Sequence, residues 1–280
     1  MRLHRQRAPV RTQHRETIQR KYIQYMILFI FEGNKREPML FRSIEHMFFP
    51  NKKETICYSF GNDIYELYTQ LNLLGDGADI VSLLRDRAVN DTNNPLYKFE
   101  KTSDFSEIFL FFDLDIHDKH IELNVKLARI EKLLNYFDNE TDNGKLYINY
   151  PMIESIRYTK ALPDAEYYSY VISRYDCCNF KNNCHNFSTY KDLNHLCLDI
   201  RESHHITEEC MIRTKTNWKH LIDMNVAKAN YICSENNEYP SHKEDISQPN
   251  IFKAQQDKYL TTDTISILNA FPIFIFDYFK

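Results

Sequence analysis

The chain contains few of the residues that build phosphate-binding loops, and this scarcity excludes one class of function. Only five of its 280 residues are glycine, and neither Gly-x-Gly-x-x-Gly nor the Gly-x-x-x-x-Gly-Lys-Ser/Thr pattern occurs. Both patterns depend on glycines that let the backbone approach phosphate groups closely. We therefore do not expect the chain to bind ATP through a glycine-rich loop.

Long hydrophobic runs and a regular cysteine framework are also lacking. No apolar run approaches the ~20 residues that cross a bilayer, and the basic residues 1–7 are followed by no apolar core of a secretory signal. Seven cysteines, an odd number without regular spacing, indicate a reducing compartment. These observations predict a cytoplasmic protein without membrane contact.

The balance of charge gives no overall attraction to nucleic acid. The formal net charge is −4, so any contact with phosphates requires a local basic patch. Residues 1–21 form such a patch, with seven Arg or Lys against a single acid. We interpret them as a basic N-terminal arm, either a solvated segment or a clamp for phosphates or a partner.

Two strongly apolar runs, which end in acidic residues, are the most informative feature that is present. The run at 25–31 is followed at once by Glu32, and the run at 108–112 by Asp113 and Asp115. Continuous apolar runs of this length are typical of strands buried on both faces of a parallel sheet. Functional residues of such sheets lie at the carboxyl ends of the strands. Converging carboxylates repel each other unless a cation lies between them, which predicts a site for a hard divalent metal.

The surrounding pattern alternates between strands and helices, which favours an α/β fold with a mostly parallel, Rossmann-like sheet flanked by helices. After Pro151 the periodicity is mostly helical, with helices expected at 205–231 and 250–271. We expect a basic arm at 1–21, an α/β domain at 22–160 and a mainly helical portion at 161–280. The expected strands are 25–31, 54–60, 108–112 and 146–150, and the expected helices of the first domain begin near Glu37, Ile64, Asp79 and Ile121.

Several short segments of the sequence resemble those of a known protein family. "IFEGNKREP" around Glu32 and "FFDLDIHD" around Asp113 and Asp115 are similar to the two acidic motifs of the TOPRIM fold of topoisomerases, primases and overcoming-lysogenization-defect nucleases. "GNDIYELY", "GKLYINYPMIES" and "ILNAFPIFIFDYF" extend the likeness over most of the chain. They are similar to stand-alone TOPRIM proteins of phage defence, namely the AriB-like effectors of PARIS systems and RloB-like proteins.

The resemblance implies a set of roles. Glu32, Asp113 and Asp115 would bind Mg²⁺ or Mn²⁺, Glu32 would be essential, and Glu37 matches a second acid of related first motifs. The protein would be the toxic effector of an abortive-infection system that cleaves host transfer RNA. It would be held inactive by an ABC-type, AriA-like ATPase and would act as a homodimer after release.

Further acidic and basic residues lie near the expected strand ends, and each of them has both a functional and a purely structural interpretation. Glu154 is either a metal ligand or base, or a favourable charge in the first turn of a helix. Lys35 and Lys160 either stabilise charge on a reacting phosphate or are solvated surface lysines. His117 and His120 either move protons or simply begin a helix.

Two other kinds of site have weaker patterns. Cys177, Cys178, Cys184, His185, His195 and Cys197 suggest zinc, but their spacing lacks paired Cys-x-x-Cys units. Arg213 and His220 fit a loose pattern of helical RNases that arises easily by chance. The aromatic run 265–279 is expected to pack on the core or, in part, to form a partner surface.

The leading interpretation is a metal-dependent TOPRIM endoribonuclease. A TOPRIM nuclease that acts on DNA is the first alternative, and a regulatory subunit of an ATPase with residual acids is the second. The metal chemistry follows from residues and spacing, whereas the RNA target, the ATPase and the dimer follow from the resemblance alone.

Overall fold

The computed structural model describes residues 26–49, 54–75, 77–87, 93–117, 121–198, 200 and 206–279. The basic arm expected at 1–21 and His120 lie outside the described residues.

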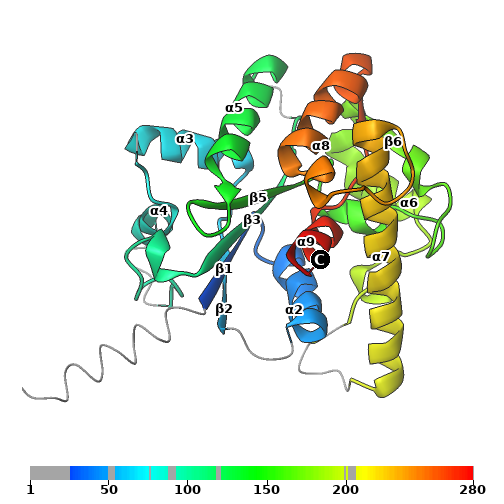
Figure 1. Cartoon of the computed structure of the whole chain (residues 1–280), viewed down its shortest axis with the longest axis horizontal. Helices are drawn as coiled ribbons and strands as arrows, with labels where there is room; N and C mark the ends of the chain where they lie inside the picture. Colours follow the sequence, from blue (N-terminus) through cyan, green and yellow to red (C-terminus); the bar gives the residue numbers. More distant parts are fainter. Residues whose placement is uncertain are drawn as a thin grey trace, which may run out of the picture.

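A mainly parallel sheet of five strands forms the centre of the fold (Figure 1). The strand order is β2-β1-β3-β5-β4, and only β4 runs antiparallel to its neighbour. The two acid-tipped runs become the adjacent strands β1 and β3. Their side chains are almost completely buried because helices cover both faces of the sheet. The strands are β1 (Met26–Phe31), β2 (Glu54–Ser59), β3 (Glu107–Asp113), β4 (Asp138–Asn139) and β5 (Gly144–Asn149).

Helices α3 and α5 cover one face of the sheet, and α2 and α9 cover the other (Figure 1). Pro38 lies in the first turn of α2, where its missing N–H breaks no intrahelical bond. Asp63 caps α3, since its carboxylate accepts hydrogen bonds from the N–H groups of Tyr65 and Glu66. The helices of this region are α2 (Arg36–Phe48), α3 (Ile64–Leu74), α4 (Ile80–Arg87) and α5 (Leu123–Tyr136).

The region after residue 160 is mainly helical and packs into the same hydrophobic core as the sheet. Helix α7 contacts α9, and β6 pairs with β7 in a small antiparallel sheet. The elements are β6 (Val171–Ser173), α6 (Phe180–Phe187), α7 (Glu208–Ser234), α8 (Gln248–Ala254), β7 (Thr264–Ser266) and α9 (Ala270–Phe279). Short 3₁₀ segments are η1 (Thr102–Asp104), η2 (Ile153–Arg157), η3 (Tyr167–Ser169), η4 (Arg174–Asn179), η5 (Leu193–His195), η6 (Lys243–Ile246) and η8 (Leu260–Thr262), and η7 (Gln255–Tyr259) is a π-helix.

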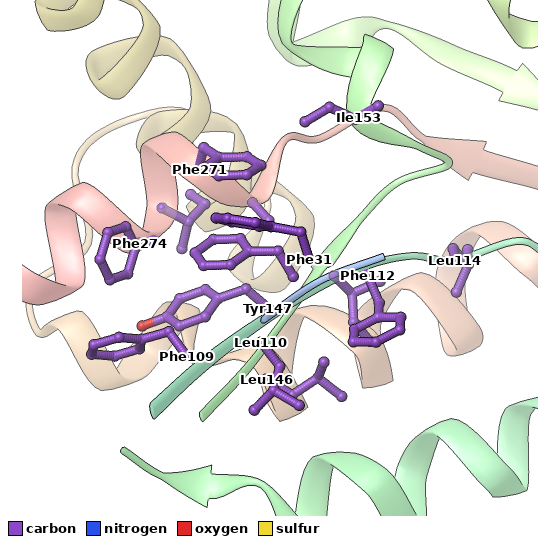
Figure 2. Close-up of a cluster of buried hydrophobic side chains, with 14 of the residues drawn as sticks. Phe31, Phe109, Leu110, Phe112, Leu114, Leu146, Tyr147, Ile153, Phe271 and Phe274 are labelled. Carbon is purple, nitrogen blue, oxygen red and sulfur yellow. The ribbon is translucent and has the colours of Figure 1, made fainter. Parts of the chain in front are cut away.

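Aromatic packing joins α9 to the sheet (Figure 2). Because side chains alternate along a strand, Phe109 and Phe111 of β3 face α9, whereas Leu110 and Phe112 face the other layer. Phe271 stacks on Phe111 with ring centroids 4.3 Å apart and planes 12° apart. The expectation that the closing aromatic run packs on the core is confirmed.

The predicted α/β class, mainly parallel sheet and helical C-terminal part are confirmed. The prediction of helix over 250–271 is wrong beyond Thr262, where the 3₁₀ segment η8 ends. Asp263 has a φ of 55°, which ends the helical path, and the residues from Thr264 then extend to pair with β6. Among the described residues, no helix combines the length and apolar character needed to cross a membrane.

Replacing Phe271 with Ala is expected to destabilise the protein by about 3–5 kcal/mol, because a fully buried ring leaves a cavity. The matched control is Phe279→Ala on the same helix, whose side chain is 44% exposed. This control is expected to cost clearly less, because nearly half of its side chain stays in water and less apolar surface is lost. Urea unfolding followed by circular dichroism measures both, and equal losses would contradict the packing role of Phe271.

Candidate metal centre

Four parallel strands bring polar side chains to one edge of the sheet. Glu32 directly follows β1, Asp113 ends β3, and Asn149 ends β5. Asp113 and Asn149 are register partners, and β1 and β3 are hydrogen-bonded neighbours. Asp63 reaches the same edge after β2, since the N–H of Gly61 donates to the Glu32 carbonyl at 2.8 Å. The two sequence motifs therefore meet at the carboxyl ends of adjacent strands, where parallel sheets carry their sites.

A backbone hydrogen bond fixes the Glu32 carboxylate. The Asp113 N–H donates to Glu32 Oε2 at 2.9 Å, and the Glu32 N–H donates to the Phe111 carbonyl at 3.0 Å. The Asp113 carboxylate is fixed in turn by the Asn149 amide, which donates to Oδ1 at 3.0 Å. Both acids are thus held by donors that carry no net charge.

Sequence reasoning missed Asn149. Its other amide atom, Oδ1, accepts a hydrogen bond from the N–H of Ala270 at 3.0 Å, which connects the centre to the start of α9. The sequence does contain a sign of this residue: Asn149 is a polar residue near the end of the otherwise apolar strand expected at 146–150.

Asp115 lies in a turn rather than on the strand. Strand alternation would place Asp113 and Asp115, two residues apart, on the same side, but β3 ends at Asp113. Asp115 has a φ of 44°, a left-handed conformation that aspartate tolerates better than most residues. The hydroxyl of Tyr65 donates to the Leu114 carbonyl at 2.7 Å and stabilises this turn. His117 Nδ1 lies 3.3 Å from Asp115 Oδ1.

Burial and mutual repulsion raise the pKa values of these acids. Burial raises the pKa of Glu32 to about 9, and the charges of Asp115, Glu37 and Asp63 add to the effect. Burial, then the Glu32 charge, raises the pKa of Asp113 well above its usual range. Burial also raises the pKa of Asp115, although His117 opposes the shift. The positive charges nearby do not balance the acids, so protons or a bound cation must compensate for the excess of negative charge.

A second pair of acids lies beside the first. Glu37 Oε1 accepts a hydrogen bond from the Gly33 N–H at 3.2 Å. Burial raises the pKa of Glu37, and the charge of Glu154 raises it further. Glu154 is 5% exposed, and its Oε2 atom is buried without a hydrogen-bond partner among the described residues. An unpartnered buried carboxylate oxygen is costly, so this atom is a natural ligand for a cation.

Glycine at position 33 gives space to Glu37. A glycine directly after a strand often permits a sharp backbone turn, but Gly33 is not among the described glycines with positive φ. A Cβ atom at Gly33 would lie 2.8 Å from Glu37 Oε2. The missing side chain therefore allows the Glu37 carboxylate to approach the backbone after β1.

The donor set suits a hard cation. Its ligands are carboxylate oxygens, which Mg²⁺ and Mn²⁺ prefer to nitrogen or sulfur. Within the described ranges, no three His, Cys, Asp or Glu side chains are close enough together to hold one ion as they stand. Mg²⁺ commonly keeps several waters and uses one or two carboxylates, which fits acids arranged in neighbouring pairs. Glu32 and Asp113 are the central candidates, and Asp115, Glu37 and Glu154 surround them.

The lysines near the centre differ from those expected. Lys35 is exposed at the start of α2, and Lys160 is exposed with Nζ 4.9 Å from the Phe187 ring centroid. Lys181 of α6 lies closer, with Nζ 3.9 Å from Glu154 Oε1. Lys126 is completely buried, and its Nζ donates to the Ile116 carbonyl at 3.3 Å. The sequence does not single out either lysine, because a lysine on a helix is typical of solvated surface.

The cysteine and histidine cluster does not assemble into a metal site among the described residues. Burial raises the pKa of the Cys177 and Cys184 thiols to about 12, so they stay protonated near neutral pH. Cys184 instead donates to the Glu154 carbonyl at 3.4 Å. Arg213 and His220 lie on α7, and seven residues separate them by about 10 Å along the helix axis.

Comparison with protein-family models, curated proteins and solved structures found no match to this chain.

The raised carboxyl pKa values predict a specific pH dependence. Between about pH 4.5 and 9, the unfolded Glu32 has lost its proton while the folded one keeps it. The folded state then binds more protons, so stability falls as pH rises through this window. In EDTA the melting temperature should fall by about 2–4 °C per pH unit. Mg²⁺ should flatten the slope, because the cation replaces the proton.

Melting curves of the wild type and Glu32→Gln between pH 5 and 8.5, in EDTA and in Mg²⁺, test this expectation. The variant lacks the ionising group, so it should be more stable than the wild type at pH 8 in EDTA and gain little from Mg²⁺. Identical slopes for the two proteins would contradict the assignment of Glu32.

Replacing Gly33 with Ala should displace the Glu37 carboxylate without straining the backbone. We expect a small change in melting temperature but about tenfold weaker Mg²⁺ binding, as is typical when a group near a metal is disturbed. Isothermal titration with Mg²⁺ measures the effect, and Glu37→Gln provides the comparison. Unchanged Mg²⁺ affinity in both variants would exclude Glu37 from the centre.

Proposed function

We propose that this chain is a metal-dependent TOPRIM-type nuclease that hydrolyses phosphodiester bonds in RNA. One observation carries the proposal: Glu32 and Asp113 end adjacent parallel strands, touch through a backbone hydrogen bond and have strongly raised pKa values. Two mutually repelling carboxylates that are buried side by side destabilise the fold unless a cation compensates for their charge, so their presence favours a cation-binding role. The order of the acids along the chain also matches the resemblance to TOPRIM proteins.

Each acid has a role that its contacts support. Glu32 and Asp113 would hold Mg²⁺ or Mn²⁺, with Asp115 beside them and Glu37 and Glu154 as the outer pair. A bound ion of this kind supplies an activated water and stabilises negative charge on the phosphate. Asn149 keeps the Asp113 carboxylate in place through its 3.0 Å hydrogen bond. Lys181 and Lys126 add positive charge at the edge of the acidic group.

Hydrolysis forms a bond from a water oxygen to phosphorus and breaks the bond from phosphorus to one ester oxygen. The departing oxygen then needs a proton. His117 suits this task because its side chain is partly exposed and its Nδ1 faces the Asp115 carboxylate. Lys35 is exposed at the start of α2, where it is available to a bound phosphate.

The cellular role rests on the resemblance. We extend the proposal to a cytoplasmic effector of abortive infection that cleaves host transfer RNA, is restrained by an AriA-like ABC-type ATPase and acts as a homodimer. Co-purification of the chain with such an ATPase, followed by sizing of the released protein, tests the complex and the dimer.

Glu32→Gln should reduce cleavage about a thousandfold, because the loss of a Lewis acid costs several kcal/mol of transition-state stabilisation. The matched control is Glu131→Gln, an exposed acid on α5, which should cleave as the wild type does. Purified proteins are assayed on transfer RNA, single-stranded DNA and duplex DNA in Mg²⁺.

Sequencing RNA ends and chromosomal breaks from cells that express each protein separates the candidates. Discrete transfer-RNA breaks that require Glu32 support the proposal. Chromosomal breaks with intact RNA favour the DNA nuclease, and full activity of Glu32→Gln excludes catalysis at this centre.

A further inference from the structure

A pocket of about 420 Å³ opens beside the candidate metal centre, and the proposed reaction uses only His117 from its wall. Pockets of this size accommodate small organic groups. Its walls combine apolar side chains with a histidine, an arginine, an exposed aromatic ring and one acid, Glu122. The residues that matter are Ile116, His117, Leu123, Arg174, Tyr175 and Cys178.

The pocket is next to the acids. Ile116 and His117 directly follow Asp115 in the chain, and His117 Nδ1 is 3.3 Å from Asp115 Oδ1. A group bound in the pocket would therefore be a near neighbour of a phosphate held at the centre.

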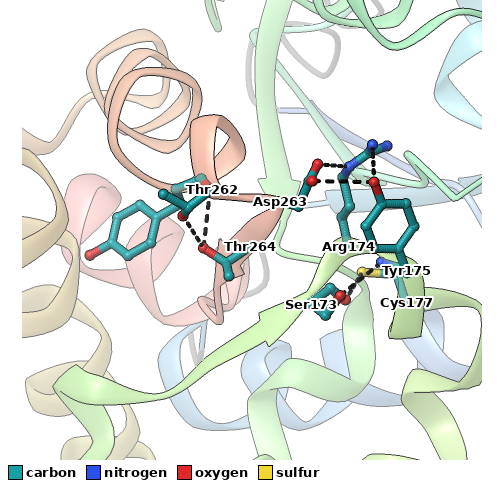
Figure 3. Close-up of polar contacts among 8 residues, drawn as sticks. Ser173, Arg174, Tyr175, Cys177, Thr262, Asp263 and Thr264 are labelled. Atoms are coloured by element: carbon teal, nitrogen blue, oxygen red, sulfur yellow. Dashed lines mark hydrogen bonds and ion pairs between the residues drawn. The ribbon is translucent and has the colours of Figure 1, made fainter.

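The Tyr175 ring is exposed and yet held in place (Figure 3). It is 62% exposed. Its hydroxyl accepts a hydrogen bond from Arg174 Nη2 at 2.7 Å and donates to Asp263 Oδ2 at 3.2 Å. The Arg174 guanidinium carbon lies 4.3 Å from the ring centroid, so the guanidinium lies over the ring.

The support under this ring is itself fixed. Arg174 Nε donates to the Asp263 carboxylate, and the Arg174 N–H donates to the Asp263 carbonyl at 2.9 Å. Ser173 and Thr264 are register partners in the β6–β7 pair, which holds the two segments together. A ring that is already ordered loses little conformational entropy when a flat ligand stacks on it.

We propose that Tyr175 is the stacking platform for an unpaired nucleobase of the strand that is cut, with Arg174 as its support. The proposal rests on the nuclease function above and names a determinant of its substrate class. Arg174 Nη1 has no partner within the described part of the chain and is available to a base edge or a neighbouring phosphate. Stacking on one aromatic ring tolerates any base, so the pocket selects exposed bases rather than a sequence.

The geometry excludes paired bases from this role. In a duplex both faces of each base are covered by its neighbours, so an aromatic side chain stacks only on bases that are splayed out in loops, ends or single strands. The substrate is therefore a single strand or a loop.

Binding of labelled oligonucleotides tests the subsite. The strands have about eight nucleotides, and the protein carries Glu32→Gln so that no strand is cut. Adding Tyr175→Ala should weaken binding of the single strand about tenfold or more. Tyr175→Phe keeps the ring but loses the hydroxyl contacts with Arg174 and Asp263, so it should weaken binding clearly less than Tyr175→Ala does. Binding of a duplex should not depend on Tyr175.

The matched control is Tyr97→Ala. Tyr97 is also 62% exposed, but it precedes β3 and therefore lies towards the other end of that strand from Asp113. It should leave binding unchanged. RNA and DNA single strands offer the same stacking surfaces, so binding is measured with both. The strand that binds with the higher affinity identifies the nucleic acid that the subsite prefers.

Three results would overturn the subsite: unchanged binding by Tyr175→Ala, equal losses in Tyr175→Ala and Tyr97→Ala, or a loss in Tyr175→Phe as large as in Tyr175→Ala. Cleavage by protein with an intact Glu32 separates this proposal from the nuclease function. Tyr175-dependent binding without any cleavage retains the subsite and rejects the nuclease. If the protein cleaves its substrate but neither cleavage nor binding depends on Tyr175, the nuclease function is supported and the stacking subsite is excluded.

Discussion

The hydrogen bond from the Asp113 N–H to the Glu32 carboxylate is the interaction on which the candidate centre depends. It joins the ends of β1 and β3 and holds together two acids that repel each other. The surrounding donors are a backbone N–H and the neutral Asn149 amide, so they orient the carboxylates without supplying charge. The remaining deficit of positive charge appears as raised pKa values, and it is the physical reason to place a cation here.

The C-terminal region is part of this centre rather than an attachment to it. Phe271 of α9 stacks on Phe111 of β3, and the first N–H of α9 donates to Asn149. The short β6–β7 pair then holds the Arg174 and Tyr175 support beside the acids. The proposed metal ligands and the proposed base platform thus come from different parts of the sequence but share one core, which fixes the distance between them.

The sequence predicted the parts of the fold that depend on local pattern. Apolar runs gave β1 and β3, and the acids that follow them identified the edge where they meet. It did not predict Asn149, Lys181 or Lys126, because their roles depend on neighbours more than 25 positions away or on burial. Asp115 was misplaced because strand alternation stops where the chain turns, and helix periodicity over 250–271 concealed β7, whose partner lies about 90 residues earlier.

The stacking of α9 on the sheet also has a consequence for the order of biosynthesis. Phe271 leaves the ribosome more than 150 residues after Asp113. Until then the aromatic face of β3 is uncovered, and Asn149 lacks the N–H that fixes its amide. A nascent chain that already carries both acidic motifs therefore still lacks the layer that covers β3 and the outer contact of Asn149. The complete arrangement around the two acids forms only after α9 has been made.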